Sequence, residues 1–119
     1  MNKEQVTVEE VLEEVEQEVI DIVKTGKQRV DIISFLLNKK EIKGWANRCK
    51  FEEFVQLIEF VDVIMFERKI AQRGQSYQHL VEQTDSEEHL KTIKEAKKKW
   101  MKKEGLEEEF VDSLVYKFL

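Results

Sequence analysis

The stretch that decides the fold is residues 51–66, FEEFVQLIEFVDVIMF. Eleven of its sixteen residues are apolar, and it contains no Gly, Pro, Lys or Arg. Its apolar residues recur at positions 51, 54, 55, 58, 61 and 65, which is the 3.6-residue period of a helix. We expect this helix to run on to about Arg73, to end before Gly74 and to form the centre of the fold.

The composition favours an all-helical protein. Of the 119 residues, 38% are charged and 41% are hydrophobic, while glycine occurs four times and proline not at all. Because β folds usually draw on Gly and Pro for their turns, this balance points to helices. The length suits one domain, residues 1–119, with a single core. We therefore predict an all-α bundle of about five helices around the central helix at 51–73.

Two helices are expected before the central one. Thr7 and Glu10 have the spacing of a capping box, so the first helix should begin there and run to Lys24, with Gly26 as its stop. Residues 28–38 fit either a helix or a buried strand, and a helix is favoured because nothing nearby is strand-like. Residues 39–47 are expected to form a loop in which Asn47 caps the central helix.

Two more helices are expected after it. A short turn at 76–83 should precede a helix at about 86–103, with the pair Thr84 and Glu87 or the pair Asp85 and Glu88 as capping signals. Gly105 should end that helix, and 106–119 should form the last one.

Charge is distributed in blocks along the chain. The net charge is −5, yet residues 91–103 carry +6, and all seven charged residues from 9 to 21 are acids. Each block is either a solvated helix face or a surface for an oppositely charged partner. The overall sign argues against nucleic acid as a partner, and no recognition motif or interleaved aromatic pattern accompanies the lysines.

Cysteine content and hydropathy restrict the possible cross-links, metal sites and cellular location of the protein. The one cysteine, Cys49, excludes an internal disulfide and a zinc site built on cysteine pairs. The sequence shows no signal peptide and no apolar run long enough to span a membrane. We therefore expect a cytoplasmic protein without a membrane partner.

Glu59 and Asp62 lie in the most apolar part of the central stretch, three residues apart and hence on neighbouring turns of one helix face. One interpretation is a solvent-facing stripe shared with Glu52 and Gln56. The other is a pair of carboxylates that face a metal ion, because coordination offsets the cost of burying unpaired charge.

The order of these features resembles the all-α nucleoside triphosphate pyrophosphohydrolases, in particular the dimeric dUTP pyrophosphatases and the MazG-type enzymes. The ExxD run from Glu59 to Asp62 is similar to the second metal-binding pair of that superfamily. The run IKGW, residues 42–45, is similar to its Phe-Lys-x-Trp element, and IKEAKKKW, residues 93–100, resembles its phosphate-contacting lysine helix. The resemblance covers about residues 7–103.

One departure from the family pattern concerns the first metal pair. Placing Trp45 on the tryptophan of the family without gaps puts this pair at Asp31 and Ser34, which gives Asp-x-x-Ser where the family has Glu-x-x-Glu. The resemblance then implies Asp31, Glu59 and Asp62 as ligands of Mg²⁺, with one ion held rather than several.

The resemblance also implies a reaction and its residues. It would be hydrolysis of a nucleoside triphosphate to the monophosphate and pyrophosphate by a homodimer, with Glu59 and Asp62 as catalytic carboxylates. The nucleotide would be bound by four residues: Lys43, Trp45, Lys97 and Lys98. For Trp45, a place in the core is the favoured alternative to stacking on a base.

A second function class stays open beside the enzyme. The altered Asp31 and Ser34 pair also suits a catalytically inactive relative that binds and regulates another protein. Its contact surfaces would be the charged helix faces at residues 9–21 and 91–103.

Overall fold

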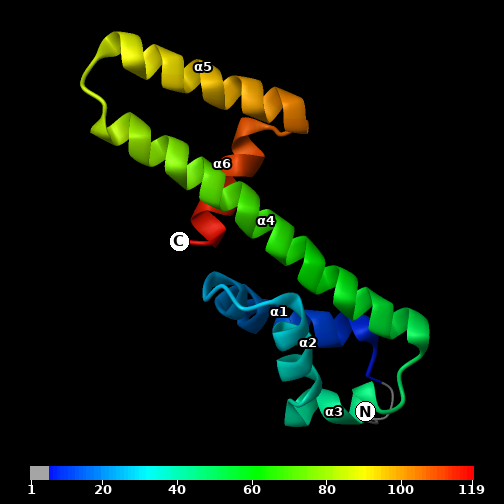
Figure 1. Cartoon of the computed structure of the whole chain (residues 1–119). Helices are drawn as coiled ribbons and strands as arrows, with labels where there is room; N and C mark the ends of the chain where they lie inside the picture. Colours follow the sequence, from blue (N-terminus) through cyan, green and yellow to red (C-terminus); the bar gives the residue numbers. More distant parts are fainter. Residues whose placement is uncertain (1–5) are drawn as a thin grey trace. The chain divides into compact units, whose positions relative to one another are not determined.

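The computed structural model describes residues 6–119, and in this range it contains helices with short connections and no strand. The helices are α1 (Val8–Lys24), α2 (Arg29–Leu37), α3 (Lys40–Ala46), α4 (Phe51–Gln83), α5 (Glu87–Glu104) and α6 (Glu108–Lys117) (Figure 1). The all-α prediction is confirmed. The described range holds six helices, one more than the five or so expected.

The chain divides into two compact units. The N-terminal unit ends at Phe66, and the C-terminal unit comprises Glu67–Leu119. The boundary falls inside α4, so this one helix contributes residues to both units.

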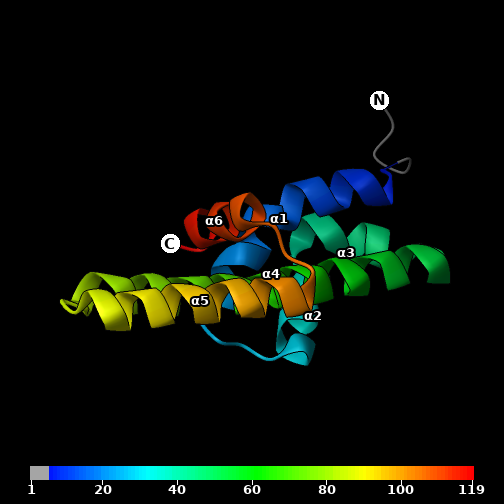
Figure 2. The same ribbon diagram turned by 90° about the horizontal axis from the view of Figure 1, so that it is seen from above.

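The N-terminal unit packs α1, α2 and α3 against the first half of α4 (Figures 1 and 2). Helix α1 begins as the capping-box spacing predicts, since the Oγ1 atom of Thr7 accepts a hydrogen bond from the amide of Glu10 at 3.3 Å. Gly26 follows its end with a φ of 82°, a conformation that favours glycine. The core is mainly aliphatic, and its buried residues include Val11, Val15, Val19, Ile32, Leu36, Ile42, Leu57, Val61 and Ile64, together with Trp45.

Helix α3 replaces the loop expected at 39–47. Ile42 and Trp45 are three residues apart and both are buried, so their shared helical face attaches this segment to the core. Asn47 does not cap α4 but ends α3, where its amide donates to the carbonyl of Lys43 at 3.1 Å. At the start of α4, the amide of Lys50 donates to the carboxylate of Glu53 at 2.9 Å, which is one half of a capping box.

Helix α4 does not end before Gly74 but continues to Gln83, and it includes the segment expected as a separate turn. Gly74 is buried at a point where α6 comes very close. A Cβ atom at this position would lie 2.7 Å from Cγ2 of Val115 and 2.9 Å from Cγ1 of Val111. The glycine therefore serves close helix packing and not helix termination.

In the C-terminal unit, α5 returns alongside the second half of α4, and α6 packs at Gly74 (Figures 1 and 2). The cap of α5 is Ser86, not Thr84 or Asp85, and its Oγ accepts from the amide of His89 at 3.4 Å. Gly105 ends α5 in the left-handed conformation, as predicted. Six hydrophobic side chains of this unit are buried: Ile70, Ala71, Met101, Val111, Leu114 and Phe118.

Candidate functional site

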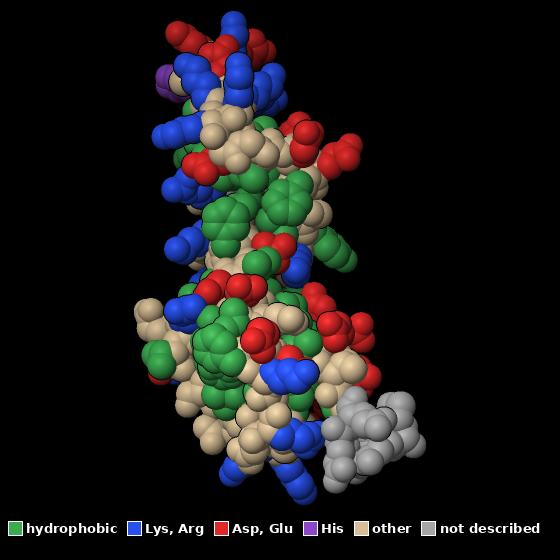
Figure 3. All heavy atoms as spheres, turned by 90° about the vertical axis from the view of Figure 1, so that its right-hand side faces the viewer, with side chains coloured by type: hydrophobic (Ala, Val, Ile, Leu, Met, Phe, Trp, Pro, Cys, Tyr) green, Lys and Arg blue, Asp and Glu red, His purple; other side chains and the backbone are tan. Residues whose placement is uncertain are grey.

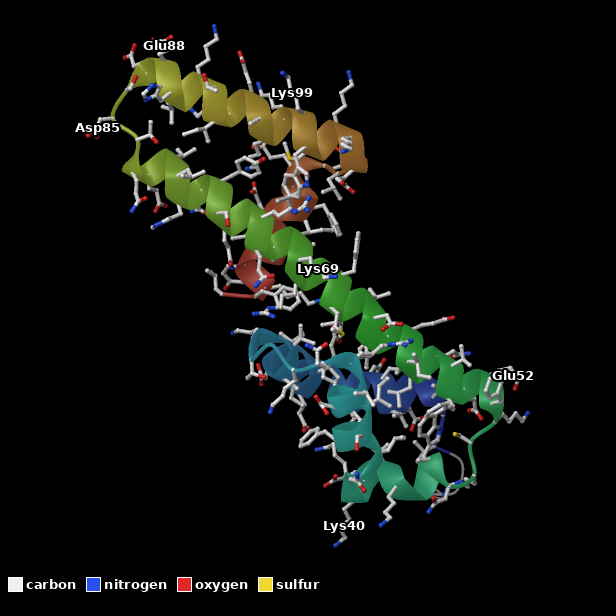
Figure 4. The ribbon with its side chains drawn as sticks, viewed as in Figure 1. Lys40, Glu52, Lys69, Asp85, Glu88 and Lys99 are labelled. Carbon is white, nitrogen blue, oxygen red and sulfur yellow. The ribbon has the colours of Figure 1, made fainter. Side chains whose placement is uncertain are left out.

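Glu59 and Asp62 of the central stretch lie on an open face of α4. Glu59 is exposed together with Glu52 and Gln56, and Asp62 is half-buried. Figure 4 shows the labelled Glu52 at the first turn of this helix. The same face carries Val63 and Phe66, which are 55% and 58% exposed. For Glu59 this arrangement is the solvent-facing stripe.

Asp62 has a cationic partner that the local sequence does not reveal. The Nε atom of Arg29 on α2 lies 2.7 Å from Oδ1 of Asp62, and its Nη2 atom donates to Oδ2 at 2.9 Å. Both carboxylate oxygens are thus bound by one guanidinium in a two-pronged geometry. The side chains are 55% and 43% exposed, so the pair contributes at most about 1 kcal/mol to stability. The guanidinium of Arg29 nevertheless neutralises the charge of Asp62, a residue that the family resemblance implies as a metal ligand.

Asp31 and Ser34 lie elsewhere on α2. Asp31 follows Arg29 by two residues, which is about 200° around the helix, so the two side chains leave it on opposite sides. Asp31 and Ser34 line an open hollow of about 660 Å³ together with Phe35, Lys39 and others, but not with Glu59 or Asp62.

The donor set does not fit Mg²⁺ as it stands. Within residues 6–119, no group of three or more His, Cys, Asp or Glu side chains is placed to hold a metal ion. Asp31, Glu59 and Asp62 are therefore not brought together as ligands, and a cation at Asp62 would have to displace the guanidinium of Arg29.

The predicted nucleotide contacts on α3 differ from each other in exposure. Lys43 is exposed, whereas Trp45 is buried, with 3% of its surface accessible. The indole Nε1 atom of Trp45 has no hydrogen-bond partner in the described part of the chain. A buried indole is not free to stack on a nucleotide base, so its role here is in the core.

In the N-terminal unit, the fold raises the pKa of Lys39 and that of Cys49. The Nζ atom of Lys39 donates to Oε2 of Glu18 at 2.7 Å, and this hydrogen bond raises the pKa of Lys39. Burial, assisted by the negative charge of Glu53, raises the pKa of the Cys49 thiol. Cys49 therefore stays a protonated thiol at neutral pH and is a poor nucleophile.

The other two predicted substrate residues, Lys97 and Lys98, belong to the C-terminal unit. With Lys94 they line a hollow of about 680 Å³, and the rest of its lining comes from α4, from Met101 on α5, from α6 and from Leu119. The Nζ atom of Lys97 lies 3.9 Å from Oε1 of Glu108 on α6. Sequence reasoning assigned Lys97 and Lys98 to nucleotide binding and missed the hollow, because its apolar residues come from three different helices.

No protein family, no curated protein and no solved structure matches this chain. None of the helices in the described range combines the length and the apolar character that crossing a bilayer requires.

Proposed function

We propose that this protein is a helical interaction module that binds another protein through charged helix faces, without catalysing a reaction of its own. The observation that carries the proposal is the Arg29–Asp62 pair. Both oxygens of the carboxylate that the resemblance assigns to catalysis are engaged by a guanidinium, at 2.7 and 2.9 Å. A carboxylate held in this way is a structural cross-link between α2 and α4.

Two exposed faces of opposite charge provide surfaces for a partner. On α1, a buried valine stripe leaves the acids on the outside, and Glu10, Glu13 and Glu14 are all exposed. On α5, Met101 is the one buried residue, while lysines cover much of the exterior. Blue side chains gather over α5 at the top of Figure 3. Single-sign faces of this kind speed association and select partners more than they add affinity.

Capture of a protein partner by variants of the full chain tests the proposal. Glu59→Gln should leave capture unchanged, because Glu59 is a solvent-exposed residue with no catalytic task in this hypothesis. A triple reversal of Glu10, Glu13 and Glu14 to Lys, or of Lys91, Lys98 and Lys102 to Glu, should abolish capture of the same partner. Circular dichroism must show that each variant is folded. Equal capture by wild type and both reversed variants would refute the proposal.

A nucleotide pyrophosphohydrolase is the second candidate function. It is supported by the adjacency of α2 and α4, the helices that carry Asp31 and the pair Glu59 and Asp62, since Arg29 links them directly. This hypothesis expects a homodimer that releases pyrophosphate from a deoxynucleoside triphosphate in the presence of Mg²⁺. Absence of release from every nucleotide, together with no rise in melting temperature on adding Mg²⁺, would remove it.

A further inference from the structure

The C-terminal unit contains a groove that its helices leave open. Its volume is about 680 Å³, and α4, α5 and α6 each supply part of its lining. The apolar lining comes from Tyr77 and Val81 on α4, Met101 on α5 and Val115 on α6. We call this feature the lysine-edged groove.

Two contacts fix the walls of the lysine-edged groove. At Gly74 the side chains of α6 approach the backbone of α4 more closely than any Cβ would allow. On the α5 side, the ring of Tyr77 stacks on Trp100 with 5.7 Å between the ring centres. Because both walls are anchored to α4, a ligand would meet a largely preformed surface, which lowers the entropy cost of binding.

The charges along the groove are unevenly distributed. Lys94 and Lys98 on its α5 edge are exposed, and neither has an ion-pair partner among residues 6–119. Lys97, the third lysine of the lining, has its Nζ atom 3.9 Å from Oε1 of Glu108 on α6. The unpaired cations are therefore on the α5 edge, while Asp112 and Glu108 are on the α6 side. An occupant should be acidic where it meets α5.

The exposure of the lining indicates the size of the occupant. Sites for small molecules surround most of the ligand surface. Here Gly74 and Met101 are the buried members of the lining, and Tyr116 is 79% exposed. An open groove between helices, with apolar residues along its length, is the geometry in which an amphipathic helix docks. Lys94 and Lys98 are four residues apart, which matches acids spaced by one turn on such a helix.

We infer that the lysine-edged groove binds an amphipathic helix of a partner protein, with the apolar face of that helix in the groove and a row of Asp or Glu residues against Lys94 and Lys98. This inference rests on the proposed interaction function and names its site and partner class. It differs from the resemblance, which assigns the lysines to phosphate.

A designed peptide pair tests the groove with the full-length chain. The probe is a fluorescein-labelled helical peptide of about 18 residues, which matches the length of α5. Leucines at i, i+3, i+4 and i+7 form one face and Glu flanks it. The control peptide has Lys in place of every Glu. Fluorescence anisotropy measures binding of both peptides at moderate ionic strength.

The decisive comparison is between two double charge reversals on the same helix. Lys94→Glu with Lys98→Glu alters the groove edge, whereas Lys99→Glu with Lys103→Glu makes an equal charge change on exposed positions outside the groove. Figure 4 shows Lys99 on the outer side of α5. The groove variant should lose about tenfold or more in affinity for the acidic peptide and gain affinity for the basic one, and the outer variant should change less than about threefold. Tyr116→Ala should weaken binding of both peptides.

Several results would overturn the inference while leaving the interaction function standing. One is an equal loss in both double variants, which would indicate a general field of α5. Another is equal binding of acidic and basic peptides by the wild type, or no binding of either. A third is tighter binding to anionic lipid vesicles with the same Lys94 and Lys98 dependence, which would make the groove a membrane-surface site. Partner capture by wild-type protein tests the interaction function separately in each case.

Discussion

The two units of this chain differ in how many hydrophobic side chains they bury. Among residues 6–119, nineteen hydrophobic residues are buried, thirteen of them in the described part of the N-terminal unit and six in Glu67–Leu119. The contrast is clear between helices of similar length, since α1 buries six of its 17 residues and α5 only Met101 of its 18. The N-terminal unit is thus stabilised by aliphatic burial, which is the largest favourable contribution to folding. The C-terminal unit buries fewer hydrophobic side chains and leaves a groove beside them.

The largest expected loss of stability comes from truncating a core side chain, and we compare this loss between the two units. Leu36→Ala removes a side chain with no exposed surface and should cost about 2–5 kcal/mol of unfolding free energy. Met101→Ala should cost about 2 kcal/mol, because Met101 borders the groove and leaves a smaller enclosed cavity. Urea unfolding followed by circular dichroism gives both values.

The two tryptophans make this comparison sharper, because Trp45 reports on the N-terminal unit and Trp100 on the C-terminal unit. Both indole Nε1 atoms are buried without a hydrogen-bond partner among residues 6–119, so replacement by Phe breaks no such bond. In the Trp45→Phe background, we expect Trp100 fluorescence to change at a lower urea concentration than Trp45 fluorescence does in the Trp100→Phe background. Coincident transitions would mean that the units unfold together and would contradict the contrast.

The next effect concerns Gly74. Gly74→Ala places a methyl group within 3 Å of Val111 and Val115, and it should lower stability by about 1–2 kcal/mol even after the helix-propensity gain of Ala. Gly44→Ala is the matched control, since its Cβ would meet only Nη1 of Arg48 at 3.6 Å. That variant should be stabilised by up to about 1 kcal/mol. If both variants gain stability, α6 does not pack against Gly74 in solution.

A smaller effect is expected at the Arg29–Asp62 pair. Arg29→Gln should cost about 0–1 kcal/mol, and the cost should shrink as salt screens the interaction. Lys27→Gln serves as the control for loss of one charge near the start of α2 and should change stability less. A loss above about 3 kcal/mol would show that the pair is buried and would assign it a larger part in joining α2 to α4.

The smallest expected effect is a pH dependence of the stability that Lys39 contributes to the fold. The hydrogen bond to Glu18 raises the pKa of Lys39 in the folded state, so its stabilising contribution is complete below the unfolded pKa of about 10.4. The contribution is lost as the pH rises through the folded pKa. Lys39→Met should therefore be less stable than wild type at pH 8, and the difference should shrink above about pH 10.4. Urea midpoints across this range measure it, with Lys40→Met as an exposed control whose difference from wild type should stay constant.

Local signals predicted several elements well. The capping box at Thr7, the glycines at 26 and 105 and the apolar stripe of α1 gave correct helix boundaries, because these effects act within one turn of helix. Gly74 and Asn47 were misinterpreted for the same reason. Both residue types are common at helix ends, but the neighbours that decided their roles were Val111 and Val115 for Gly74, and the buried Ile42 and Trp45 for α3.

The candidate site shows the same limit of prediction from local sequence patterns. The sequence identified Glu59 and Asp62 as unusual within an apolar helix, but the cation that binds Asp62 lies 33 residues earlier in the chain. No local pattern associates Arg29 with Asp62, since their pairing depends on how α2 lies against α4. The groove beside Lys94 and Lys98 was inaccessible to sequence reasoning because its lining comes from three helices.

The sequence by itself determined that this protein is all-α, which helices it forms at each end of the chain and where its charge gathers, because helical period, capping and net charge are properties of neighbouring residues. Tertiary structure alone decided the partner of Asp62 and the role of Gly74 in the central helix. Packing against α2 gave Asp62 a guanidinium partner, and the close approach of α6 explains a glycine at position 74 inside a helix that runs on to Gln83. Both features depend on contacts between residues far apart in the chain, and a local sequence pattern cannot predict such contacts.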